Sequence, residues 1–447
     1  MRLITWLILP ALCVCMSANA QWYNGPSQKT GLVLSLHLTD SSATLYSPLQ
    51  SDNPIPVSKW SSENDRLALE CKSIGLTMEL TRRDSTLVGY WKQGFLKEDI
   101  TFYPNDTIFA LRRPQTPQPP YRFDEETVVA DYTDSQGNTV HLEGTLTYPK
   151  GKGRHACLVM VSGSGQQNRD EELFQHRPFL VLADYLASQG IAMLRYDDRG
   201  VGASKGSLDS ADTPLFAEDA EAMLRAVKNN RHVDAARLGI GGHSEGGAIA
   251  PMVAARNKDV KYVVMLAGQG CTGLDVMLQQ NEAIYQASGL SERLLAVRMA
   301  AMRELFAMPA GSKQKDYKAV IDRHTAGLAK PEIDSLGLGR GSAATMKQQL
   351  ESRWMRNFLT LDPATYLPEV KCPVLALNGS KDRQVVCEPN LRRIKELCPQ
   401  AHCIALPGLN HLFQTCTTGS PSEYQLIEET IAPEALEKIA DFIKGIR

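Results

Sequence analysis

The stretch Gly-Gly-His-Ser-Glu-Gly-Gly at residues 241–247 constrains the fold of this chain more than any other. It follows a short apolar run, residues 237–240, that predicts a buried strand, and it leads into residues 248–255, which predict a helix. In such a sharp turn Ser244 is held out for chemistry, because side chains at Gly242 and Gly246 would clash with the neighbouring strand and helix. The same residues also fit a glycine-rich turn whose serine only caps the helix. The rest of the chain is needed to choose between a catalytic and a structural serine.

The first twenty residues have the pattern of a secretory signal peptide. Arg2 precedes an apolar stretch to about residue 14, and Ala18-Asn19-Ala20 forms a small-residue cleavage site before Gln21. We therefore expect an exported protein, periplasmic or secreted, after cleavage near Ala20. No later stretch approaches the 18 unbroken apolar residues of a membrane span.

Charge and cysteine content exclude several classes of partner. The whole chain has 48 basic and 50 acidic residues, so removing Arg2 with the leader leaves 47 minus 50, a net charge of −3. This balance predicts no nucleic-acid partner. The cysteines show no zinc-ligand spacing, and we expect neither a metal nor another cofactor.

The segment 21–113 is predicted to be a small antiparallel β module of about six strands. Apolar residues alternate with polar ones, as in 32–38 and 76–80, and turn signals separate the runs. Trp60, Tyr90 and Trp91 would suit a sugar-binding face, but core packing is the preferred interpretation. The proline-rich segment 114–124 predicts a semi-rigid linker.

From residue 125 the pattern changes to alternating strands and helices. Strands are predicted at 157–161, 191–196, 237–240 and 261–266, and helices at 174–188 and 214–228. This alternation predicts a doubly wound, mostly parallel sheet with helices on both faces, built from residues 125–270 and 367–447. Between them, 271–366 predicts a helical lid with helices at 274–287, 291–307, 313–329 and 343–357. Its methionines suit either an adaptable apolar binding wall or simple core packing.

Loops after the predicted strands carry the candidate chemistry, because ligands bind at the carboxyl ends of parallel strands. Asp382 follows the strand 373–377 and His411 follows the strand 402–406. The chain order Ser244, Asp382, His411 is that of a nucleophile, acid and base in an open α/β sheet. The glycine pair of Gly163-Ser164-Gly165 lets backbone N–H groups point into such a site. The loop 197–204 is interpreted as a structural brace.

Several segments together resemble the α/β-hydrolases of the bacterial esterase and serine-aminopeptidase-like group. They are residues 163–170, 195–202, 242–247, 375–382 and 408–414, and the resemblance spans about residues 125–446. It implies Ser244 as nucleophile, His411 as base and Asp382 as the acid that orients it. It also implies the backbone N–H groups of Glu245 and Ser164 as oxyanion donors. The β module is similar to one carried by some exported members of the group.

A serine hydrolase acting on small-molecule carboxylic esters is the expected function, because esters need less leaving-group protonation than amides. One alternative is a peptidase acting on short peptides or their N-termini, for which Glu282 and Glu304 are candidate anchors. Another is a non-catalytic ligand-binding protein on a hydrolase scaffold. The sequence leaves the oligomeric state open.

Eight cysteines remain once Cys13 and Cys15 leave with the leader, which permits disulfides in an oxidising compartment. Cys387 and Cys416 each lie five residues beyond a candidate catalytic residue, so a bridge between them is one hypothesis. A pair between Cys398 and Cys403, or free buried thiols, are the alternatives.

Overall fold

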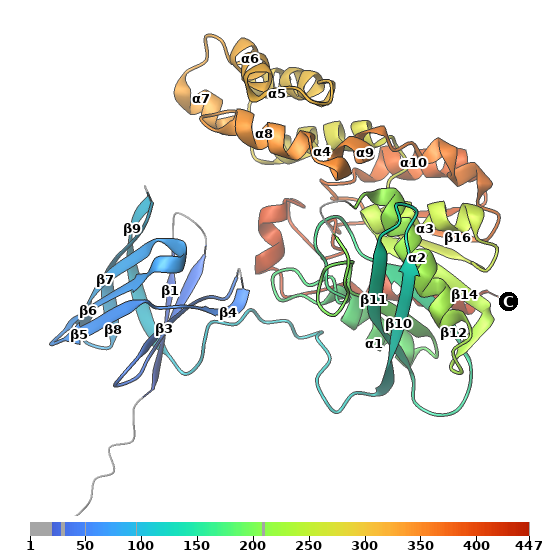
Figure 1. The fold of residues 1–447 in the computed structure, drawn as a ribbon, viewed down its shortest axis with the longest axis horizontal. Helices are drawn as coiled ribbons and strands as arrows, with labels where there is room; N and C mark the ends of the chain where they lie inside the picture. Colours follow the sequence, from blue (N-terminus) through green and yellow to red (C-terminus); the bar gives the residue numbers. More distant parts are fainter. Residues whose placement is uncertain (1–19, 28–31, 50, 95, 208–210, 447) are drawn as a thin grey trace, which may run out of the picture. The chain divides into compact units, whose positions relative to one another are not determined.

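The computed structural model describes residues 20–27, 32–49, 51–94, 96–207 and 211–446. The predicted signal peptide therefore lies outside the described residues except for Ala20. The chain divides into two compact units, residues 1–112 and 113–447 (Figure 1). Within the described residues, no helix has both the length and the apolar character needed to cross a membrane.

The first unit is a nine-stranded antiparallel sheet in the order β4-β3-β2-β1-β9-β8-β7-β6-β5. Alternate side chains turn inward, and Leu36, Leu45 and Phe102 are fully buried. The sequence predicted about six strands and the sheet has nine. Short polar strands such as β5 were missed because apolar and polar residues do not alternate in them. The strands are β1 Gln21–Pro26, β2 Val33–Leu38, β3 Ala43–Ser47, β4 Ser51–Ile55, β5 Lys59–Glu63, β6 Arg66–Cys71, β7 Leu76–Arg83, β8 Thr86–Gln93 and β9 Leu96–Asn105.

The three aromatic residues weighed as a sugar-binding face do not form one. Trp91 is 3% exposed in the core of the sheet, and Trp60 packs against the same core. The Lys97 ammonium lies 3.7 Å from the centre of the Tyr90 ring. Core packing, the preferred interpretation, is confirmed for both tryptophans.

The second unit contains an eight-stranded mixed sheet in the order β10-β11-β13-β12-β14-β15-β16-β17. The β10-β11 hairpin joins β13 in antiparallel fashion, and every later pairing is parallel. This confirms the predicted α/β-hydrolase architecture. The strands are β10 Phe123–Thr133, β11 Thr139–Pro149, β12 His155–Val161, β13 Ala192–Tyr196, β14 Val233–His243, β15 Val263–Leu266, β16 Val374–Gly379 and β17 His402–Leu406.

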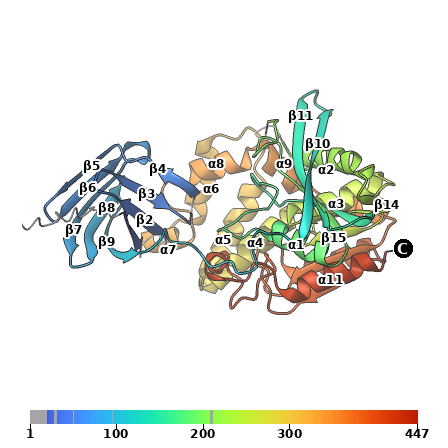
Figure 2. The same ribbon diagram turned by 90° about the horizontal axis from the view of Figure 1, so that it is seen from below.

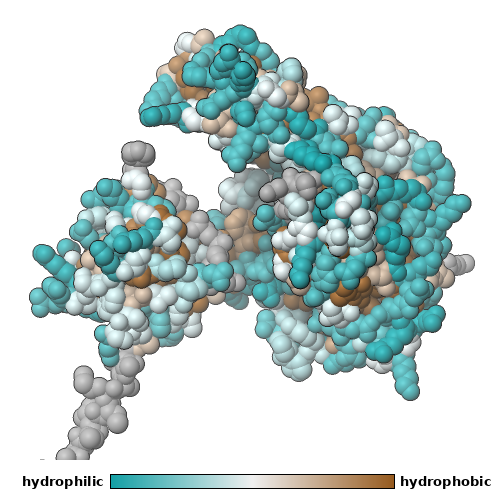
Figure 3. Space-filling model, viewed as in Figure 1, coloured by the Kyte–Doolittle hydropathy of each residue, from teal (hydrophilic) through white to brown (hydrophobic). Residues whose placement is uncertain are grey.

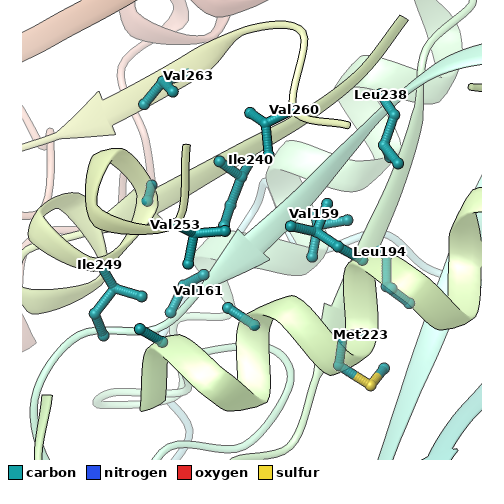
Figure 4. Packing of buried hydrophobic residues seen from close by; sticks show 14 of the residues in the cluster. Val159, Val161, Leu194, Met223, Leu238, Ile240, Ile249, Val253, Val260 and Val263 are labelled. Carbon is teal, nitrogen blue, oxygen red and sulfur yellow. The ribbon is translucent and has the colours of Figure 1, made fainter. Parts of the chain in front are cut away.

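Helices cover both faces of this sheet because its strands are apolar on both sides. In β12, Val159 packs in a cluster with residues of α2, α3 and α10, part of which Figure 4 shows. Leu158 packs in a second cluster, with residues of α1 and α11. Figure 2 shows α11 along one side of the sheet and α2 and α3 along the other. The helices are α1 Pro178–Ser188, α2 Thr213–Lys228, α3 Glu245–Arg256, α10 Cys387–Leu397 and α11 Pro433–Lys444.

The insertion between β15 and β16 is helical, as expected, but has six helices rather than four. The predicted helix 313–329 ends at His324 and a short α7 follows; the predicted helix 343–357 breaks where Ser352 caps α9. Met302 and Tyr317 are buried in a core of its own, and the insertion's surface in Figure 3 is mostly hydrophilic. The helices are α4 Gly273–Ala287, α5 Glu292–Phe306, α6 Gln314–His324, α7 Lys330–Ser335, α8 Ser342–Leu350 and α9 Arg353–Thr360.

Candidate functional site

Ser244 lies in the sharp turn between β14 and α3. Its backbone has φ 54° and ψ −115°, a conformation that a non-glycine residue adopts only under strain. The turn is tight because two glycines allow it: a Cβ on Gly242 would lie 2.1 Å from the backbone of Gly246, and one on Gly246 would lie 2.2 Å from the Val161 oxygen. The local sequence thus forces the Ser244 side chain away from the sheet.

Asp382 and His411 come together in the loops after the last two strands of the sheet. His411 Nδ1 lies 2.7 Å from Asp382 Oδ2, and both side chains are buried. The other Asp382 oxygen accepts the backbone N–H groups of Gln384 and Val385, at 2.7 and 2.9 Å. Because an ionised carboxylate only accepts, the proton of a neutral His411 lies on Nδ1, which leaves Nε2 as a base.

Two cavities meet at Ser244. The first, of about 230 Å³, brings Ser244 and His411 into one wall, beside Ser164 and Gln384. The second, of about 180 Å³, also contacts Ser244, Ser164 and Gln384, but it extends beneath the insertion and is not lined by His411. Its other walls are Glu245, Gln269, Val276, Met277, Gln280, Trp354, Phe358 and Val385.

The backbone donors near Ser244 differ in availability. Gly163 N–H donates to Glu171 Oε1 at 2.6 Å, so this group is already engaged. Ser164 lines both cavities. Glu245 is the first residue of α3, where a backbone N–H has no acceptor within the helix. The two N–H groups implied by the resemblance thus belong to residues that line one cavity together with Ser244.

A buried pair that the sequence analysis missed joins three parts of the site. His243 Nδ1 lies 3.0 Å from Glu171 Oε1, and its Nε2 donates to the His411 carbonyl at 2.9 Å. Burial lowers the pKa of His243, but the Glu171 carboxylate and these hydrogen bonds outweigh it, so the pKa is raised. Both ring nitrogens of His243 thus face acceptors, and the ring ties the loop after β12 to the loop that carries His411. His243 stood in the motif, but nothing in the local pattern marked Glu171.

The loop 197–204 is a structural brace, as interpreted from the sequence, and its contacts are to the end of β12 and the loop after it, the β10-β11 turn and α2. Asp197 pairs with Arg169 at 2.6 Å. Arg199, only 1% exposed, pairs with Asp219 at 2.8 Å and Asp134 at 3.1 Å. Asp198 accepts the Ser162 hydroxyl at 2.7 Å and the backbone N–H of Gln167, yet burial raises the pKa of Asp198 to about 8.

All eight cysteines in the described part of the chain are free thiols, so the proposed bridge is wrong. Cys387 Sγ lies 3.8 Å from the Asn378 carbonyl, whereas Cys416 Sγ lies 3.3 Å from the Gly408 carbonyl. Each thiol turns toward a nearby backbone oxygen of its own segment rather than toward the other thiol.

The candidate peptide anchors do not reach Ser244. Glu304 pairs with Arg323 and His324 on the insertion, and Glu282 is exposed. Neither lines a cavity that contacts Ser244. Across the described residues there is also no group of three His, Cys, Asp or Glu side chains suited to a metal ion.

The chain is similar to several proteins of known activity or structure. Esterase EstD of Thermotoga maritima is 27% identical over 274 residues, which cover 61% of this chain and 58% of that protein. Among solved structures, the α/β hydrolase GrgF from Penicillium sp. sh18 has 18% identity and a TM-score of 0.44, covering 72% of this chain and 99% of its own. Est1E from Butyrivibrio proteoclasticus, solved with ferulic acid, has 18% identity and a TM-score of 0.41, covering 70% and 96%.

The sequence pattern of one family matches residues 176–414, more than half of the chain. That segment begins just before α1 and includes Ser244, Asp382 and His411. The chain belongs to the serine aminopeptidase S33 family, within the α/β-hydrolases.

Proposed function

We propose that this protein is a serine hydrolase that cleaves carboxylic esters through Ser244, His411 and Asp382. The observation that carries the proposal is that Ser244, in its strained conformation, and His411 line the same cavity. Asp382 holds His411 through its Nδ1 atom. Strain of this kind persists in folded proteins where function requires it. A non-catalytic binding protein has no need of it.

The mechanism follows from the positions of the groups. His411 Nε2 takes the proton of Ser244, and the oxygen attacks the carbonyl carbon of the ester. The backbone N–H groups of Glu245 and Ser164 stabilise the oxyanion. His411 then protonates the leaving alcohol, and water, activated in the same way, releases the acid from the acyl-enzyme.

The charges around Ser244 favour an ester over a peptide with a free amino terminus. An aminopeptidase needs an unengaged carboxylate to bind the substrate ammonium group. Among the described residues that line the two cavities, the carboxylates are Glu171 and Glu245. Glu171 Oε1 already accepts Gly163 N–H and pairs with His243, and the Glu245 carboxylate accepts hydrogen bonds from Thr213 and Trp354. Peptidase activity is therefore the second candidate, and the family's description is what supports it.

The test is Ser244→Ala, assayed on p-nitrophenyl esters beside aminoacyl p-nitroanilides. Loss of the nucleophile should reduce turnover by roughly a million-fold, with an unchanged circular dichroism spectrum. Ester cleavage by the wild type without anilide cleavage supports the proposal. An alanine variant that keeps more than a few per cent of its ester activity would contradict it.

We also propose that the protein is exported, to the periplasm or beyond, after loss of residues 1–20. The support is the small-residue site at residues 18–20 together with the start of β1 at Gln21. Cleavage near Ala20 would leave β1 whole.

A further inference from the structure

The two cavities at Ser244 are suited to different halves of an ester. His411 must protonate the leaving alcohol, so the alcohol lies on the side of Ser244 where His411 lies. His411 lines the cavity of about 230 Å³ and is absent from the walls of the cavity of about 180 Å³. The acyl group therefore enters the second cavity, beneath the insertion.

The acyl cavity, as we call the second one, is small, and part of its wall is apolar. Val276 and Met277 of α4, Trp354 and Phe358 of α9, and Val385 of the core form one apolar cluster there. Its volume lies below the roughly 300–1,000 Å³ of typical small-molecule sites. Such a cavity fits a short acyl chain.

Trp354 is the member of this apolar cluster that hydrogen bonds hold in place. Its indole Nε1 donates to both oxygens of the Glu245 carboxylate, at 2.8 and 2.9 Å. Its ring stacks on Phe358, with centroids 5.2 Å apart and planes 23° apart. Glu245 is 4% exposed and has one other side-chain donor, Thr213, at 2.7 Å. Moving the indole would leave a buried carboxylate short of a donor, which is costly.

We propose that Trp354 determines acyl-chain specificity: the indole, anchored by Glu245, closes the acyl cavity and limits the length of acyl chain beside Ser244. The inference rests on the proposed ester hydrolysis. A residue of the insertion thus sets the chain limit, and it does so through a hydrogen bond to the residue that follows the nucleophile.

The experiment compares kcat/KM for p-nitrophenyl esters from acetate to octanoate in the wild type and in Trp354→Ala. In the wild type each methylene that the cavity accommodates should raise kcat/KM about fourfold, until the chain meets the indole and the value falls. In Trp354→Ala the optimum should move to longer chains, and the octanoate-to-butyrate ratio should rise at least about tenfold. Because this ratio is taken within one variant, a general loss of activity through Glu245 cancels.

Leu359→Ala is the matched control, because Leu359 lies on the same helix but packs into the insertion's own core. Its chain-length profile should match the wild type. If Trp354→Ala does not fold, Trp354→Leu keeps an apolar side chain and should show the same direction of change. An unchanged profile in a folded, active Trp354 variant overturns the inference. That result is distinct from residual activity in Ser244→Ala, which overturns the proposed function itself.

Discussion

Three carboxyl groups, those of Asp198, Asp219 and Glu245, line a cavity of about 10 Å³ next to Gly163. Burial raises the pKa of each of them, most clearly for Asp198, whose pKa is about 8. A cavity of this size is about large enough for one water molecule, which polar walls would hold. The ionisation of these carboxyl groups should therefore affect how the free energy of unfolding depends on pH.

Asp198 should make the protein less stable as the pH rises. Its pKa is raised from an ordinary value of 3.8 to about 8, so between these values the folded protein holds a proton that the unfolded chain has lost. The free energy of unfolding then falls by about 1.4 kcal/mol per pH unit over this window. Asp198→Asn cannot ionise and should flatten this dependence. Urea denaturation at pH 5, 6, 7 and 8 measures it, and parallel curves for wild type and variant would refute the assignment.

At the scale of elements, the loop 162–177 is held in a conformation that it would not adopt alone. Glu171, Phe174 and Gln175 all have positive φ, at 51°, 50° and 62°. Ion pairs hold the loop: Arg169 with Asp197, and Asp170 with Arg195. These contacts offset the strain and place Ser164 at the cavities.

Glu171→Gln should loosen this loop, because a neutral amide keeps an acceptor for Gly163 but loses the ion pair with His243. We expect a lower kcat with little change in KM, and a loss of about 1–3 kcal/mol in the free energy of unfolding at pH 6. The pKa of His243 is raised, so the pair is fully present below about pH 6.5. It is lost as the pH rises through the higher folded value.

The difference in the free energy of unfolding between wild type and Glu171→Gln should therefore become smaller at alkaline pH. Glu172→Gln is the control, because Glu172 pairs with Arg177 at the surface. A variant of Glu171 with wild-type kcat at pH 6 would show that the pair has no positioning role.

At the scale of the whole molecule, each unit has a hydrophobic core of its own, and the first strand begins at Gln21. Gln21 pairs with Leu38 in the β1-β2 register, so an attached leader would continue directly from a strand end. We expect the intact mass of the exported protein to correspond to a chain beginning at Gln21. An exported form that retains residues 1–20, or a protein found only inside the cell, would contradict this.

The two-sided sheet and the Ser244 turn could be predicted because their signals are local. Residues 157–161 are apolar throughout, as a strand covered on both faces requires. Glu171 and Trp354 escaped prediction because their partners lie far away in sequence: 72 residues separate Glu171 from His243, and 109 separate Trp354 from Glu245. The Cys387–Cys416 bridge, one of the hypotheses from the sequence, is wrong for a related reason: the proximity of two loops does not determine where their thiols point.

The insertion between β15 and β16 also delays the moment at which the site can exist. A nascent chain emerges from its N-terminus, so Ser244 and its elbow appear well before β16 and β17 bring Asp382 and His411. The 167 residues from Ser244 to His411 take roughly 10 to 30 s to synthesise. On the proposed roles, a chain that ends before residue 411 carries a nucleophile without its base, and hydrolytic activity arises only after His411 has been synthesised.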